Sequence, residues 1–214
     1  MNREVFVEQM EKLISFRTMS SDVDQNRLAI EYVRSILPRG VKTELIENNG
    51  ALIFLAGTGE DIYKPEFGYL VHIDVVAGRN DQFDLRVDGE NMYGRGVSDM
   101  KFSIPVGIGL MKTTVESGKD FTFAITSDEE VGGGNGTNHM ANDLGFRPKV
   151  LIIPDGGNNF ELVNRSKGVA HIWIESTGKP THASKIWEGK NALHPLMKLA
   201  SQLLAIYEIN EHEK

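Results

Sequence analysis

Apolar residues follow two spacings along this chain, one helical and one typical of strands. Near the N-terminus Phe6, Met10 and Leu13 recur every three or four residues, which predicts an amphipathic helix over residues 3–16. The same spacing predicts further helices over residues 24–37, 99–118, 137–144 and 192–209. Short apolar runs bounded by Gly, Asn or Pro predict strands over residues 41–46, 51–56, 69–76, 121–126 and 150–153.

Three of these strands, the last three along the chain, are mostly apolar on both faces, the pattern of strands buried within a sheet. Helical segments lie between them. The fold class predicted is therefore α/β, with a mixed, mostly parallel sheet flanked by helices. Each of the three runs leads into acidic residues, and the carboxyl ends of parallel strands meet at one edge of a sheet. We expect these acids to gather there.

The chain changes character after Asp155. Residues 170–176 alternate apolar and polar side chains, which predicts a half-exposed strand, and the last helix is followed by a polar tail. We therefore predict two domains. Residues 1–165 hold the sheet and its acids, and residues 166–214 form part of a smaller α+β domain.

Composition narrows the class of protein. Lys and Arg number 23 against 30 Asp and Glu, a net charge of −7 over 214 residues, and the basic residues are scattered, so no patch for nucleic acid is expected. Because cysteine is absent, any metal must be bound by His, Asp or Glu. The N-terminus has no apolar signal segment, and no run of about 18 apolar residues occurs. We expect a cytoplasmic protein that does not enter a membrane.

His72 and Asp74 interrupt the apolar strand 69–76. Strand side chains alternate, so these two residues share a face of the sheet. This arrangement suits a metal-binding imidazole with a carboxylate that orients its ring. The ordinary alternative is a buried polar pair in which each side chain satisfies the other.

Further acids occur where loops leave the predicted strands or enter a helix. Asp99 follows a Gly-Arg-Gly turn, Glu129 and Glu130 lie in an acidic run before three glycines, and Asp155 follows the strand 150–153. Taken singly, Asp99 could be a helix N-cap and the acidic run an exposed turn. Taken together, one His and several carboxylates at one sheet edge fit two divalent ions bridged by a carboxylate better than a structural zinc. No HExxH, GxSxG or GxxxxGK[ST] motif is present.

Three segments, 72–76, 94–101 and 127–132, resemble the metal-binding motifs of the M20 metallopeptidases and amidohydrolases. That family includes acetylornithine deacetylase, succinyl-diaminopimelate desuccinylase, aminoacylase and carboxypeptidases. The resemblance implies a zinc-peptidase-like catalytic domain that hydrolyses an amide or peptide bond in a small N-acyl amino acid or short peptide. It also implies two zinc ions, with cobalt or manganese as alternative ions.

The resemblance also implies a role for each site residue. The metal ligands would be His72, Asp99, Glu130 and Asp155. In this arrangement Asp99 bridges the two ions. Asp74 would orient His72, and Glu129 would be the general base that takes a proton from the attacking water and returns it to the leaving amine. Members of the family tend to have a cis peptide bond after the bridging acid, here Asp99–Met100.

Residues 178–192 resemble the start of the family's lid, or dimerisation, domain. In relatives the His that matches His182 reaches into the partner subunit of a homodimer and stabilises the oxyanion. This chain matches only the first part of the family's architecture, and the second His of the second zinc has no counterpart.

Two other functions are therefore considered. One is a catalytically incomplete fragment that acts only as a metal-binding or interaction module. The other is a nucleotide-binding α/β domain, which is poorly supported because the chain has no phosphate-binding loop.

Overall fold

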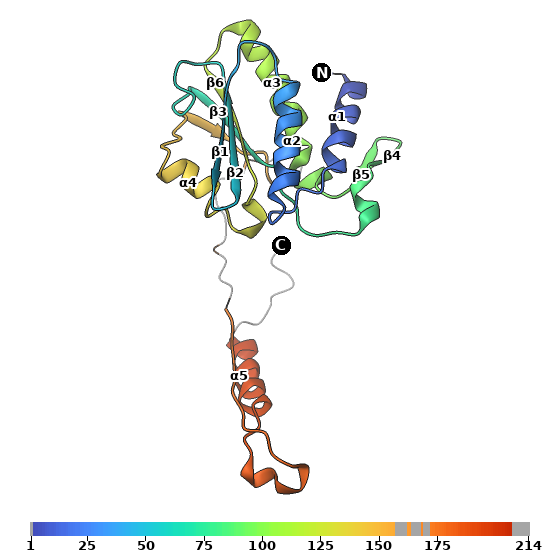
Figure 1. Cartoon of the computed structure of the whole chain (residues 1–214), viewed down its shortest axis with the longest axis vertical. Coiled ribbons are helices and arrows are strands. Elements are labelled where there is room, and N and C mark those ends of the chain that lie inside the picture. Colours follow the sequence, from blue (N-terminus) through green and yellow to red (C-terminus); the bar gives the residue numbers. More distant parts are fainter. Residues whose placement is uncertain (1, 157–161, 164–167, 169–171, 207–214) are drawn as a thin grey trace. The chain divides into compact units, whose positions relative to one another are not determined.

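The structure is a computed structural model that describes residues 2–156, 162–163, 168 and 172–206. The chain divides into two compact units, Met1–Glu161 and Leu162–Lys214, and each is described by itself. In the first unit a central sheet has helices on both faces (Figure 1). The fold is therefore α/β, as the hydrophobic pattern predicts.

The central sheet has five strands in the order β1-β2-β6-β3-β7. Their bounds are Lys42–Asn48 (β1), Ala51–Gly57 (β2), Phe67–His72 (β3), Phe121–Thr126 (β6) and Val150–Ile152 (β7). β3 runs parallel to both β6 and β7, whereas β1, β2 and β6 pair antiparallel, so the sheet is mixed. His72 pairs in register with Thr126. The acid-bearing loops after β3 and β6 therefore leave the same edge of the sheet.

Four helices cover the sheet. Their bounds are Arg3–Ser15 (α1), Val23–Ser35 (α2), Ser103–Ser117 (α3) and Thr137–Asn142 (α4). In Figure 1, α1, α2 and α3 lie on one face of the sheet and α4 on the other. The buried side chains form two clusters to match: α1, α2 and α3 contribute to one, and Met140 of α4 packs with Ile53 and Leu70 in the other. The apolar stripes of the helices thus supply both halves of the core.

A short hairpin and a tight turn complete the first unit. β4 (Arg86–Asp88) and β5 (Asn91–Tyr93) form the antiparallel hairpin. The turn Val97–Lys101 precedes α3 and carries Asp99. Asp99 is not a helix N-cap, because Phe102 holds that position, and the Asp99–Met100 peptide bond is cis.

Two strand predictions differ from the structure. The prediction that residues 150–153 are buried is wrong: Val150, Leu151 and Ile152 are 41–53% exposed because β7 is the edge strand. The prediction of a strand over residues 170–176 is also wrong for its described part, residues 172–176, which has no regular structure. A strand needs a neighbour for its hydrogen bonds. Residues 170 and 171 lie outside the described part.

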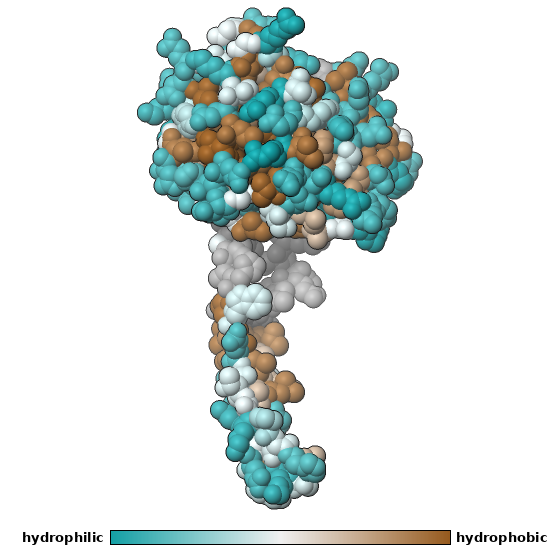
Figure 2. Space-filling model, in the orientation of Figure 1, coloured by the Kyte–Doolittle hydropathy of each residue, from teal (hydrophilic) through white to brown (hydrophobic). Residues whose placement is uncertain are grey.

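The second unit contains the helix α5 (Leu193–Ile206), the short helical turn Ala183–Glu188 and an isolated bridge between Lys179 and Lys190. Many of its apolar side chains are exposed, including Trp173 at 91% and Trp187 at 76%. Figure 2 shows hydrophobic residues on the surface of this unit. Among the described residues of the chain, no helix combines the length and apolar character that a membrane crossing requires.

Candidate metal centre

His72, the last residue of β3, lies at the centre of the candidate site and is only 2% exposed. Its Nδ1 atom lies 3.0 Å from the backbone carbonyl oxygen of Asp74 and 3.4 Å from Oδ1 of the same residue. Because a carbonyl oxygen can only accept, Nδ1 carries a proton in this arrangement. Nε2 is therefore the nitrogen that can offer a lone pair to a metal ion.

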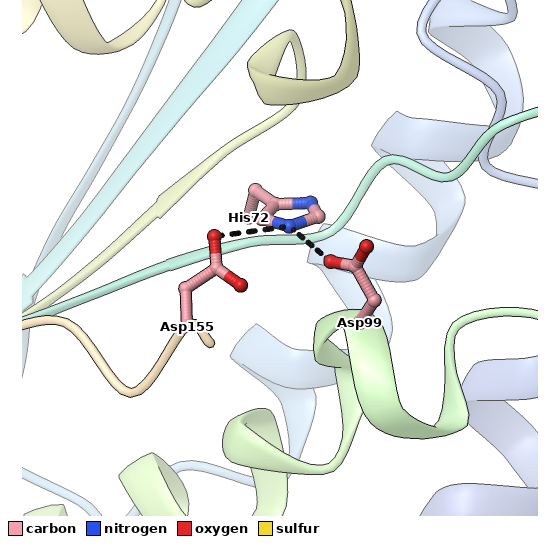
Figure 3. A group of neighbouring side chains, drawn as sticks. All are labelled: His72, Asp99 and Asp155. Carbon is pink, nitrogen blue, oxygen red and sulfur yellow. Dashed lines mark hydrogen bonds and ion pairs between the residues drawn. The ribbon is translucent and has the colours of Figure 1, made fainter. Parts of the chain in front are cut away.

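Three carboxylates face Nε2 of His72. The Asp99 Oδ1 atom lies 3.0 Å away, the Glu129 Oε2 atom 3.8 Å and the Asp155 Oδ2 atom 4.0 Å. His72, Asp99 and Asp155 each offer one donor atom, and these three atoms lie within 4.8 Å of one another (Figure 3). The three residues come from the end of β3, the turn before α3 and the loop after β7.

The Asp74 carboxylate is fully buried beside this group. It accepts hydrogen bonds from the backbone N–H groups of Glu129 (3.2 Å) and Glu130 (3.1 Å) and from the Ser20 hydroxyl (2.7 Å). Asp74 thus stabilises the backbone turn that carries Glu129 and Glu130, and it also orients the ring of His72. The sequence gives no sign of this role for Ser20, since Ser20, Ser21 and Asp22 together precede a helix as cap residues do, and here Asp22 caps α2.

The carboxylates shift one another's protonation and that of His72. Burial lowers the pKa of His72, but the hydrogen bond to Asp74 and the negative charges of Asp74 and Glu129 raise it to about 9 overall. Burial raises the pKa of Glu129, and the charges of Asp155 and Glu130 raise it further against the opposing effect of His72. Burial and the charge of Asp99 raise the pKa of Glu130. A divalent cation would relieve this crowding of negative charge.

The donor set fits such an ion. One imidazole nitrogen and several carboxylate oxygens are the ligands of zinc and of similar borderline divalent ions. Glu130 is not one of the three donors that lie within 4.8 Å of one another, and His182 belongs to the second unit. Glu130 is placed by its backbone contact to Asp74, and His182 lies in the second unit, where its ring accepts a hydrogen bond from the Ser184 N–H. Their roles stay predictions.

Lys101 is a second buried charge near the site. Its side chain is fully buried, and Nζ donates to the backbone carbonyl oxygens of Leu13 and Phe16, each at 2.9 Å. Burial lowers the pKa of Lys101 to about 7, against the opposing attraction of Asp74. Sequence reasoning assigned no role to this residue, because a Lys one turn before an apolar helix is usually exposed.

The fold and the donor group define an α/β domain with a centre suited to a divalent metal ion. The chain belongs to peptidase family M20/M25/M40, whose family model matches residues 68–206. The matched range contains all of the expected metal ligands and Glu129.

Two curated relatives illustrate the similarity. A [LysW]-lysine/[LysW]-ornithine hydrolase of Sulfurisphaera tokodaii is 32% identical over 138 residues, which is 64% of this chain and 36% of that protein. A succinyl-diaminopimelate desuccinylase of Rickettsia canadensis is 25% identical over 228 residues, which is 94% of this chain and 58% of that protein. The chain thus spans about a third to three fifths of the length of these relatives.

The fold is similar to that of a solved M20 family metallo-carboxypeptidase from Sulfolobus solfataricus. The TM-score is 0.57 at 18% sequence identity, over 73% of this chain and 38% of that one. At this identity the likeness shows the fold alone.

Proposed function

We propose that this chain is the metal-binding catalytic part of a zinc-dependent M20 hydrolase that cleaves an amide or peptide bond in a small N-acyl amino acid or short peptide. The observation that carries the proposal is the convergence of the His72, Asp99 and Asp155 donor atoms within 4.8 Å. Membership of the M20/M25/M40 family supports it, as do relatives named as a [LysW]-lysine/[LysW]-ornithine hydrolase and a succinyl-diaminopimelate desuccinylase.

In this proposal His72, Asp99 and Asp155 would hold one ion, and Glu130 together with Asp99 would hold a second. A bound zinc ion supplies a Lewis acid that polarises the scissile carbonyl and lowers the pKa of the attacking water. Asp74 keeps the proton on Nδ1 of His72 and so keeps Nε2 turned toward the ion.

Glu129 moves the proton. Its carboxylate lies beside Nε2 of His72, and its raised pKa brings it nearer the range of an effective general base. It takes a proton from the attacking water as the C–O bond forms, and gives that proton to the amide nitrogen as the C–N bond breaks. His182, from the partner in a homodimer, would stabilise the oxyanion. Zinc as the ion, the homodimer and a cytoplasmic location all belong to this proposal.

The test substitutes the proposed general base, Glu129, and the proposed metal ligand, Glu130, in separate variants. Glu129→Ala should lower hydrolysis of N-acyl amino acids and dipeptides by roughly 100-fold or more, because it removes the proton carrier. It should leave the zinc content of the chain nearly unchanged. Hydrolysis is followed by release of the free amine and zinc by elemental analysis.

Glu130→Ala is the matched control, since it deletes the neighbouring carboxylate and should lower bound zinc. If Glu129→Ala loses as much zinc as Glu130→Ala, Glu129 is a ligand and not the base. If the unchanged chain binds zinc but hydrolyses none of the substrates, the catalytically incomplete module is the better description.

A further inference from the structure

Residues 16–20, within the segment that joins α1 to α2, run directly beside the residues that follow His72. We call these residues the α1–α2 strap. The Thr18 hydroxyl donates to the Ile73 carbonyl oxygen at 2.6 Å, and the Val75 N–H donates to the Thr18 carbonyl oxygen at 2.8 Å. Met19 and Val75 form an isolated parallel bridge. The strap is thus hydrogen-bonded to Ile73 and Val75, the residues before and after Asp74, as a short additional strand would be.

The strap ends at Ser20, whose hydroxyl donates to Oδ2 of Asp74 at 2.7 Å. The other hydrogen bonds to this carboxylate come from the backbone N–H groups of Glu129 and Glu130. Ser20 therefore supplies a short side-chain hydrogen bond to Oδ2 of Asp74, while Nδ1 of His72 lies 3.4 Å from Oδ1 of the same carboxylate. A buried carboxylate depends strongly on such donors, because water does not replace them.

The beginning of the strap is hydrogen-bonded to the turn that carries Asp99. Lys101, at the end of the turn that carries Asp99, donates from Nζ to the carbonyl oxygens of Leu13 and Phe16. These carbonyls belong to the last turn of α1 and the first residue of the strap, where a cation is favoured by the helix dipole. The Lys101 backbone N–H also donates to the Gly96 carbonyl oxygen at 2.8 Å, which closes the Asp99 turn.

We propose that the α1–α2 strap is a positioning element of the metal centre. Ser20 fixes Asp74, and through it the ring of His72, while Lys101 fixes the turn of Asp99. Both contacts end on the strap, through Ser20 and Phe16. The strap therefore determines the orientation of His72 relative to Asp99. Neither Ser20 nor Lys101 is among the three side chains whose donor atoms converge. The inference rests on the proposed function, in that the site must bind a divalent ion.

The test uses cobalt(II), whose visible absorption reports the geometry of its ligands. Ser20→Ala should weaken cobalt binding roughly tenfold, the size of effect seen when the partners of metal ligands are removed, and should change the cobalt spectrum. Ser20→Thr keeps the hydroxyl and should restore both. The matched control is Ser21→Ala, at the exposed neighbouring residue, which should bind cobalt as the unchanged chain does.

A double-mutant cycle with Asp74→Asn separates positioning from general stability. If Ser20 acts through Asp74, Ser20→Ala should cost clearly less affinity in the Asp74→Asn background than alone. Lys101→Met, compared with Lys101→Arg and with Lys112→Met at an exposed site on α3, gives the second measurement and should also alter the spectrum.

The outcomes are distinct. Unchanged cobalt affinity in Ser20→Ala, or equal costs of Ser20→Ala with and without Asp74, overturns the positioning role while leaving the proposed function standing. If the unchanged chain fails to bind cobalt or zinc at all, the proposed function itself is wrong.

Discussion

At the scale of single residues, His72 and Asp74 form a buried polar pair whose hydrogen bonds extend beyond the pair itself. Asp74 is more than a partner for the histidine, since its backbone carbonyl contacts Nδ1 while its carboxylate accepts from Ser20, Glu129 and Glu130. Such a pair in an apolar strand was open to two interpretations from sequence. The three carboxylates that face the other ring nitrogen favour a metal site over a pair that only satisfies itself.

The raised pKa of His72 predicts that metal and proton compete. Without metal, His72 with a pKa of about 9 is protonated at pH 7, and a metal ion must displace the proton from Nε2. Zinc affinity should therefore rise with pH between about 6 and 9, by up to about tenfold per pH unit for one released proton. Calorimetry in buffers of different ionisation enthalpy measures the released proton. Affinity that is constant over this range would contradict a shifted, ligating His72.

The raised pKa of His72 also determines how this residue contributes to the free energy of unfolding as the pH changes. Because the pKa of His72 in the folded chain lies above its ordinary value of 6.5, protonation stabilises the metal-free fold. That contribution is fully present below about pH 6.5 and is lost as the pH rises through about 9.

At the scale of elements, strand register and turns place the donors. β3 and β6 pair in parallel with His72 opposite Thr126, so the loops bearing Asp74 and Glu129 begin side by side. The turn Val97–Lys101 brings Asp99 to the same edge. Packing of α3 on the sheet holds this turn, and α3 has a glycine at a point of very close approach. A Cβ atom on Gly107 would lie 2.6 Å from Cε2 of the buried Phe123.

This contact predicts opposite effects for two glycines of α3. Gly107→Ala should lower the free energy of unfolding by about 1–3 kcal/mol, because the added methyl group overpacks against Phe123. Gly109→Ala has nothing within 4 Å of the added atom and should raise the free energy of unfolding by about 0.5–1 kcal/mol, through better helix propensity. Urea denaturation of both variants gives the comparison. Equal effects would show that α3 is not packed on Phe123 as described.

At the scale of the whole molecule, the chain has a well-packed first unit and a second unit whose apolar side chains are largely exposed. The three donors of the candidate metal centre, His72, Asp99 and Asp155, lie wholly within the first unit. They come from segments far apart in the sequence, so an ion would join the end of β3 to the loop after β7. Binding should therefore stabilise the folded unit as a whole.

Zinc loading should raise the unfolding temperature of the chain. A ligand at 100 times its dissociation constant adds about 2.7 kcal/mol to the free energy of unfolding when it binds only the folded state. At least one zinc per chain should be found by elemental analysis, and Asp155→Ala should lose both the zinc and the thermal shift. Asp143→Ala, at the exposed C-cap of α4, is the control and should keep both. A shift that survives Asp155→Ala would place the ion elsewhere.

Much of the fold could be read from the sequence, because apolar spacing reports which faces are buried. The five strands of the sheet, the helices of the first unit and the α/β class all follow from it. The pattern failed at β7 and at residues 172–176, where burial and strand formation depend on a neighbour that a linear pattern does not reveal.

The sequence by itself determined the chemical types of the site, since His72 interrupts a predicted strand and the acids follow predicted strands or turns: Asp99, Glu129, Glu130 and Asp155. Tertiary structure alone decided which of them converge, because donor distances depend on strand register and on how turns pack. It also decided the roles of Ser20 and Lys101. Their partners lie 54 and more than 80 residues away, and hydrogen bonds over such separations leave no mark in local sequence spacing.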